Sequence, residues 1–100
     1  MKLPKKLSIL GHKYKVKTWK NTAKEGAGQV YGRCMVDALT IFIATEYPES
    51  QVEATLLHEI IEALNYHLEL RLEHNQIQGL EAGLYSVLKD AGLYGRKGCK

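Results

Sequence analysis

Residues 55–64 read TLLHEIIEAL, and this stretch decides the fold. Its apolar residues recur at the spacing of an amphipathic helix, in which positions four apart lie on one face. His58 and Glu62 are four apart, so their side chains point the same way, and Glu59 lies one step round the helix. The stretch therefore predicts a helix that carries an imidazole and two carboxylates beside its buried stripe.

This spacing is close to the His-Glu-x-x-His pattern, in which two histidines bind zinc and the glutamate is a general base. Glu62 stands where that pattern has its second histidine. The alternative is an ordinary amphipathic helix whose polar face carries these residues, because glutamate is a common helix former. Further potential ligands elsewhere in the sequence would favour the metal-binding interpretation over the ordinary helix.

The helix that contains this motif is expected over residues 50–69. Ser50 and Glu53 have the spacing of a capping box, and Pro48 just before them ends the preceding segment. We therefore expect Ser50 to be the N-cap residue.

A second helix is predicted over residues 75–89. Its expected core side consists of Ile77, Leu80, Leu84, Val87 and Leu88. Gly79 and Gly83 lie four apart within it, which is unfavourable for a helix and is explained most simply by the close approach of another backbone.

The N-terminal half of the chain has the pattern of strands. A hairpin is expected over residues 7–20 with its turn at Gly11-His12, and two further strands between residues 30 and 44 with a short turn around Asp37. Residues 21–29 have the composition of a loop and residues 94–100 that of a frayed basic tail. The expected fold is α+β: a small antiparallel or mixed sheet of three to four strands packed on two helices.

Length and composition fit one small domain over residues 1–100. A hydrophobic content of 45% is enough for one modest core, and no apolar run has the length of a membrane span or of a signal core. Cys34 and Cys99 lie too far apart in sequence to suggest a metal or redox pair. We therefore expect a soluble cytoplasmic protein with reduced thiols, in which a membrane has no part.

The formal net charge of +3 is unevenly distributed. Lysines cluster between Lys2 and Lys20, whereas most acidic residues fall between Glu46 and Glu81. Such basic clusters usually solvate a strand, and they accompany no recognisable nucleic-acid module. Nucleic acid is therefore a possible partner that the sequence does not favour.

A metal at His58 and Glu62 requires a third protein ligand. Glu69 lies about 16 Å further along the helix axis, which is too far to share one ion. His74 follows a short segment that can reverse the chain, so it can return to the His58 and Glu62 face. Glu81 lies seven positions after His74, on the same face of the second helix, and is the reserve ligand.

Tyr85 lies one turn beyond Glu81 and could donate a hydrogen bond to a bound oxyanion. The ordinary alternatives are that His74 is an exposed histidine at the start of the helix, that Glu81 is a solvated charge and that Tyr85 lies at the edge of the amphipathic face.

These motifs together resemble small bacterial and phage-encoded zincin-like metallopeptidases. The resemblance rests on the strand LTIFI at residues 39–43, the motif TLLHEII at 55–61, the segment LEHNQI at 72–77 and the tripeptide GLY at 83–85. It implies a minimal zincin-like fold and, for a phage-encoded protein, the host cytoplasm. In such proteins the strand before the motif helix binds an extended peptide by edge pairing. The resemblance gives that role to Thr40, Ile41, Phe42 and Ile43.

The resemblance also implies roles at the site. His58 is a ligand and Glu59 the general base; Glu62 and His74 complete a set of two histidines and one carboxylate, which suits Zn²⁺ or another divalent transition metal. Two functions are open: a zinc-dependent peptidase, or a catalytically reduced binding protein whose partner is a protein or a nucleic acid. Either could be a monomer or a homodimer.

Overall fold

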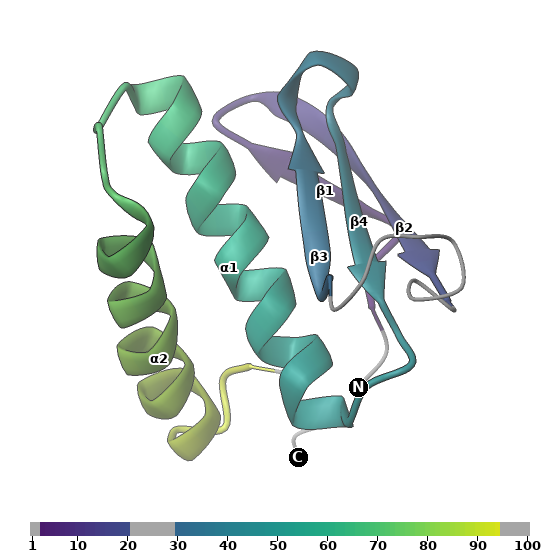
Figure 1. The fold of residues 1–100 in the computed structure, drawn as a ribbon, viewed down its shortest axis with the longest axis vertical. Coiled ribbons are helices and arrows are strands. Elements are labelled where there is room, and N and C mark those ends of the chain that lie inside the picture. Colours follow the sequence, from purple (N-terminus) through teal and green to yellow (C-terminus); the bar gives the residue numbers. More distant parts are fainter. Residues whose placement is uncertain (1–2, 21–29, 95–100) are drawn as a thin grey trace.

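The computed structural model describes residues 3–20 and 30–94, and these form one sheet and two long helices. In chain order the elements are β1 Lys6–Ile9, β2 His12–Trp19, β3 Gly32–Met35, the short 3₁₀ helix η1 Val36–Ala38, β4 Thr40–Ala44, α1 Glu49–Leu68 and α2 His74–Asp90 (Figure 1). The predicted α+β class with a mixed sheet and two helices is confirmed. The predicted loop at residues 21–29 and tail residues 95–100 lie outside the described residues.

The sheet has the strand order β1-β2-β4-β3. The β1–β2 and β3–β4 pairs are antiparallel, whereas β2 and β4 run parallel. The expectation that Thr40, Ile41, Phe42 and Ile43 form a free strand edge is wrong, because β4 has a neighbour on each side. Among the described strands, β3 is the outer strand on that side of the sheet.

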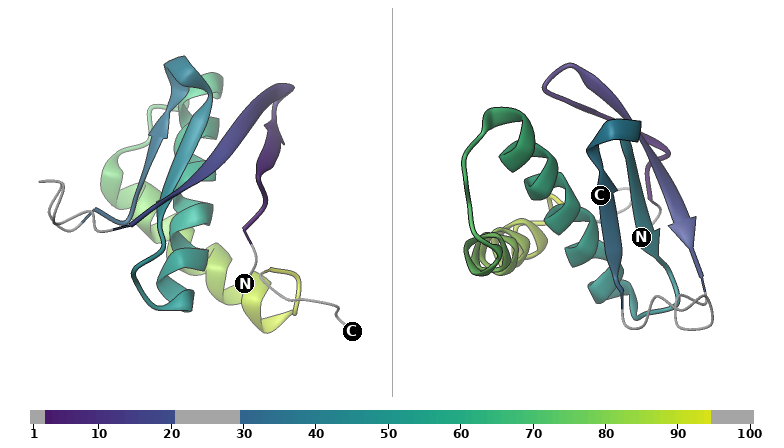
Figure 2. Two further views of the ribbon diagram at one scale, coloured as in Figure 1. Left: turned by 90° about the vertical axis from the view of Figure 1, so that its right-hand side faces the viewer. Right: turned by 45° about the horizontal axis from the view of Figure 1, so that its top comes forward.

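The helices form two further layers on one face of the sheet. Leu56 and Ala63 of α1 are buried against Ile41 and Ile43 of the sheet, and α2 packs mainly against the outer side of α1 (Figure 2). Ile77 of α2 is buried there, with Leu57 and Ile61 of α1. None of the helices in residues 3–20 and 30–94 combines the length and hydropathy that a membrane crossing requires.

The hairpin turn lies one residue earlier than expected. Ile9 pairs with His12, so the two turn residues are Leu10 and Gly11, with φ values of 53° and 84°. Positive φ at both positions gives the tight turn that matches the twist of the strands, and glycine adopts it without strain.

The predicted capping box at Ser50 is wrong. The helix begins at Glu49 after Pro48, and no side chain caps it. Glu53 is instead fully buried, where its carboxylate accepts hydrogen bonds from the Tyr85 hydroxyl and the Lys89 ammonium, both at 2.7 Å. Burial alone would raise the pKa of Glu53, but these two donors outweigh it and the pKa lies below its usual value.

A capping box is present at the start of α2, where Glu73 and Gln76 exchange side-chain and backbone hydrogen bonds. Tyr94, the first residue of the predicted frayed tail, also makes a specific contact. The Tyr94 hydroxyl donates to the backbone oxygen of Glu53 at 2.6 Å, so this tyrosine is not part of a frayed tail.

The core side of α2 is narrower than predicted. Leu80, Leu84 and Val87 are 43–63% exposed, because α2 has only α1 as its main neighbour and a single seam of side chains is enough for that contact. Gly79 and Gly83 also face open space: no described atom lies within 4 Å of a Cβ built at either position. The expected close approach of a second backbone at these glycines is therefore wrong.

The close approach occurs instead at Gly32, where β3 crosses α1. A Cβ at this position would lie 2.5 Å from Cγ2 of Thr55, 3.0 Å from the backbone oxygen of Phe42 and 3.1 Å from Oε2 of Glu59. A side chain here would push β3 away from α1.

We expect Gly32→Ala to lower the free energy of unfolding by about 1 to 3 kcal/mol, because Thr55 is short and β-branched and the strand backbone cannot yield. Gly79→Ala is the matched control and should raise it by up to about 1 kcal/mol, since alanine favours an exposed helix interior. Urea denaturation of both variants measures the difference. Equal effects of the two substitutions would contradict the close packing of β3 on α1.

Candidate metal centre

Three potential ligands from two helices converge beside β3. His58 and Glu62 lie one turn apart on α1, and His74 is the first residue of α2. One ligand atom from each residue lies within 4.8 Å of the other two, and Nε2 of His58 is 3.3 Å from Oε2 of Glu62. The sequence-based expectation that His74 returns to the His58 and Glu62 face is met by this geometry.

The reversal between the helices is built by local backbone and side-chain contacts. Glu69 ends α1 in the left-handed conformation with φ of 52°, and Arg71 has φ of 60°. The Asn65 side chain accepts a hydrogen bond from the Leu72 N–H at 2.9 Å and its amide faces the Leu72 carbonyl at 3.5 Å. Asn65 therefore fixes the segment that delivers His74, in addition to the capping box of α2.

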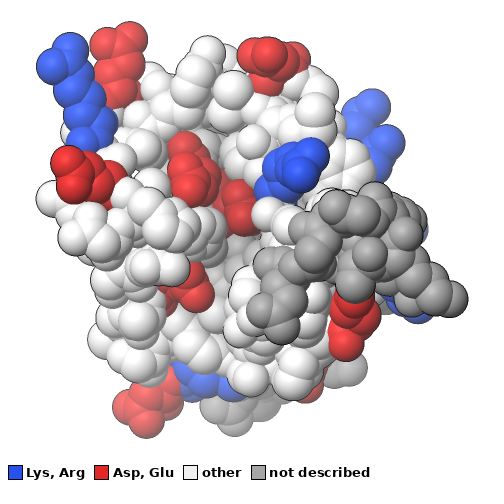
Figure 3. All heavy atoms as spheres, in the orientation of Figure 1, with Lys and Arg blue, Asp and Glu red and all other residues white. Residues whose placement is uncertain are grey.

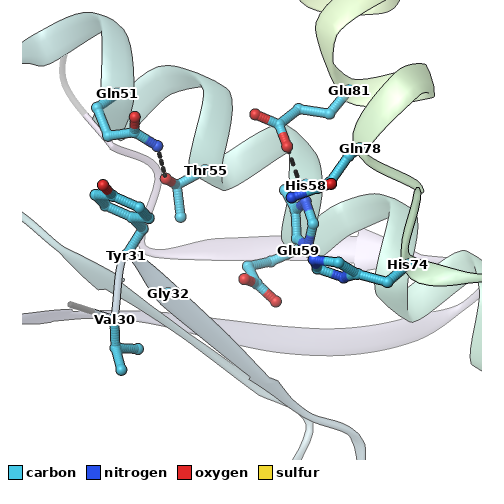
Figure 4. Close-up of a pocket in the computed structure, with 10 residues that line it drawn as sticks. All are labelled: Val30, Tyr31, Gly32, Gln51, Thr55, His58, Glu59, His74, Gln78 and Glu81. Atoms are coloured by element: carbon cyan, nitrogen blue, oxygen red, sulfur yellow. Dashed lines mark hydrogen bonds and ion pairs between the residues drawn. The ribbon is translucent and has the colours of Figure 1, made fainter. Parts of the chain in front are cut away.

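Glu81 contacts the ring of His58 on the side away from Glu62. Glu81 belongs to α2, and its Oε1 lies 2.8 Å from Nδ1 of His58 on α1 (Figure 4). A carboxylate that accepts a hydrogen bond from Nδ1–H orients the ring so that Nε2, which faces Glu62, is the atom that could bind an ion. Glu81 is therefore placed to orient a ligand and lies outside the three-residue group, which differs from its expected role as a reserve ligand.

Tyr85 does not face the site as predicted. Its hydroxyl donates to the buried Glu53 carboxylate, and burial together with that carboxylate raises its pKa to about 12. Tyr85 lies beyond the site along α2, where it holds the two helices together.

Glu59 is buried beside the three potential ligands, with 6% of its surface exposed. Burial raises the pKa of this carboxyl to about 7; the neighbouring His58 opposes the rise, whereas Glu62 and Glu81 add to it. A carboxyl with this pKa is present in both protonation states near neutral pH, which is the property of a general base.

The site lies in a groove between β3 and the two helices. On one side a hollow of about 560 Å³ is lined by ten residues, all drawn in Figure 4: Val30, Tyr31, Gly32, Gln51, Thr55, His58, Glu59, His74, Gln78 and Glu81. A second hollow of about 570 Å³ continues past Glu62 towards Tyr66. Acidic side chains gather near the centre of this face of the molecule (Figure 3).

Sequence reasoning missed several of the residues that line this groove, among them Gln78 and Cys34. Gln78 lies one turn after His74 on α2, and the same four-residue spacing that links His58 to Glu62 could have found it. Cys34 points into the groove from β3, where burial and the carboxylates of Glu59 and Glu62 raise its pKa to about 11. Its thiol is therefore protonated and a weak nucleophile at neutral pH.

The three potential ligands fit a divalent transition metal. Two imidazole nitrogens and one carboxylate oxygen are a common catalytic set, and ligand atoms around one tetrahedral zinc lie about 3.4 Å apart. The ligand atoms here lie within 4.8 Å of one another, so a bound ion would draw them closer together. The donor chemistry does not distinguish zinc from manganese, iron or nickel.

Comparison with protein-family models, curated proteins and solved structures finds no match to this chain. The site is accordingly interpreted from its own residues.

The pKa of Glu59 has a consequence for stability. Burial favours the protonated form of Glu59, so protonation of this carboxyl adds to the free energy of unfolding. This contribution is complete below about pH 4.5 and is lost as the pH rises through about 7. In metal-free protein, Glu59→Gln should match the wild type at pH 4 and exceed its free energy of unfolding by up to about 3 kcal/mol at pH 8. Denaturation with a chelator at a series of pH values measures this, and parallel profiles would contradict it.

Proposed function

We propose that this protein is a metal-dependent hydrolase that cleaves peptide bonds in an extended chain. One observation carries the proposal: the ligand atoms of His58, Glu62 and His74 lie within 4.8 Å of one another, directly beside a buried Glu59 whose pKa is about 7. A metal-ligand set next to a general base is the arrangement that hydrolysis of an unactivated amide requires.

The chain supplies the groups for such a reaction. A zinc or similar ion held by His58, Glu62 and His74 would act as a Lewis acid and acidify water. Glu59 is placed to take a proton from water and to pass it to the leaving amine; a bound cation would favour the ionised form of this carboxyl, which is the form that accepts the proton. Glu81 keeps the His58 ring oriented through the hydrogen bond at Nδ1.

The outer strand β3 supports a peptide as the substrate class. Among the described strands it pairs only with β4, and it runs past Glu59 at Gly32. An extended peptide could pair with its free edge, with alternate side chains in the hollows on either side of the site. In this proposal residues 32–35, and not residues 40–43, would pair with the peptide.

The second candidate is a catalytically reduced protein that binds a peptide or protein in the same groove. Glu62 favours it, because a carboxylate in place of a histidine adds negative charge to the ion's surroundings and weakens its effect on water.

We expect protein purified without a histidine tag to bind one equivalent of Zn²⁺, measured by calorimetry and elemental analysis. His58→Ala and His74→Ala should abolish tight binding, whereas His12→Ala, a histidine on β2, should not. Glu81→Gln should weaken binding by about 10- to 100-fold, because the orientation of His58 relaxes. Unchanged affinity in His74→Ala would overturn the ligand set.

We expect the zinc-loaded protein to cleave members of a quenched fluorescent peptide library, and Glu59→Gln to retain zinc but to lose about 10²- to 10⁴-fold in kcat/KM. Cleavage that survives this substitution would exclude Glu59 as the base. Zinc binding with saturable peptide binding and no cleavage by the wild type would favour the second candidate.

A further inference from the structure

The face of the sheet that points away from α1 carries the basic residues of the strands. Tyr14, Val16, Ile41 and Ile43 are buried in the core with α1, and successive side chains of a strand point to opposite faces. Both helices lie on the core side (Figure 2). None of the described helices covers the other side, which we call the open sheet face; it includes Lys6, Lys13, Lys15, Lys17, Trp19, Arg33, Met35 and Phe42.

Strand register places these residues in rows. Lys6 pairs with Lys15, while Phe42 lies between Lys17 on one side and Arg33 on the other. None of the residues in the four described strands is acidic, so the strands contribute only positive charge. The acidic residues of the candidate metal centre lie on the helices, across the sheet from this surface.

One end of the open sheet face has groups that can stack on a flat ring. Trp19, Arg33, Met35 and Phe42, together with Thr18, line a hollow of about 340 Å³. The Arg33 guanidinium lies 5.7 Å from the centre of the Trp19 ring. Aromatic rings and guanidinium planes are the surfaces on which proteins stack unpaired bases.

We propose that the open sheet face binds single-stranded nucleic acid. The lysines of β2 contact the phosphates, and a base stacks in the hollow beside Trp19 and Phe42. A single strand fits better than a duplex, because only unstacked bases can reach an aromatic hollow on a flat sheet. An anionic membrane or an acidic protein would use the lysines but would give no role to stacking in the hollow. This inference does not rest on the metal centre.

The test is fluorescence anisotropy with labelled oligouridylate and oligothymidylate of about 16 nucleotides at low salt. We expect saturable binding and quenching of Trp19, the only tryptophan of the chain. Changing Lys13, Lys15 and Lys17 together to glutamine should reduce the slope of log K against log salt by about 2, at about 0.7 per phosphate. Trp19→Ala should weaken binding about tenfold or more, and Trp19→Phe should restore most of it.

A charge-matched control separates a site from general attraction. Lys17→Gln and Arg71→Gln each remove one positive charge, but Arg71 lies in the reversal between the helices. Only the first should weaken binding, and circular dichroism checks that each variant folds. If Trp19→Ala does not fold, the quenching and Trp19→Phe decide. Equal losses in the two glutamine variants, no quenching, or binding to phosphatidylserine vesicles without binding to oligonucleotides would overturn the proposal.

Discussion

Polar contacts hold α2 against α1 at both ends of the helix pair, and the candidate site depends on them. At one end Asn65 binds the backbone of the reversal; at the other, Tyr85 and Lys89 of α2 reach the buried carboxylate of Glu53. Between them lie a small apolar cluster and the hydrogen bond from His58 to Glu81. Because the site takes His74 from α2 and the rest of its ligands from α1, its geometry is set by the helix contact and not by the sheet. An ion bound there would in turn cross-link the two helices.

Local periodicity explains why the main features of the site could be predicted from the sequence. The spacing of His58 and Glu62 is a property of any α-helix, and the short segment before His74 allows the chain to turn back. The role of Glu81 could not be read in this way, because helical spacing gives only the face on which a residue lies. Whether Glu81 reaches a bound ion or Nδ1 of His58 depends on the distance between the two helices, and no local sequence pattern encodes that distance.

The errors share the same physical origin. The pattern of residues 39–44 correctly predicts a strand, yet its central place follows from the parallel pairing with β2, a contact between segments far apart in the chain. Glu53 has the spacing of a capping residue, but in the folded chain its carboxylate forms an ion pair with Lys89 of the other helix. At Gly79 the sequence suggested close packing, whereas the position without room for a Cβ is Gly32, where side chains of α1 lie against the strand. Tertiary contacts decided each case.

The separation of charge across the sheet limits which ligands each face can hold. The groove contains Glu59, Glu62 and Glu81, so it favours a cation and disfavours a polyanion, while the strands present lysine and arginine to the other side. A phosphate chain on the sheet would therefore not compete with a peptide in the groove. Strand β3 separates the two surfaces: it contributes Gly32 and Cys34 to the groove and Met35 to the open face, and Arg33 lines a hollow on each side.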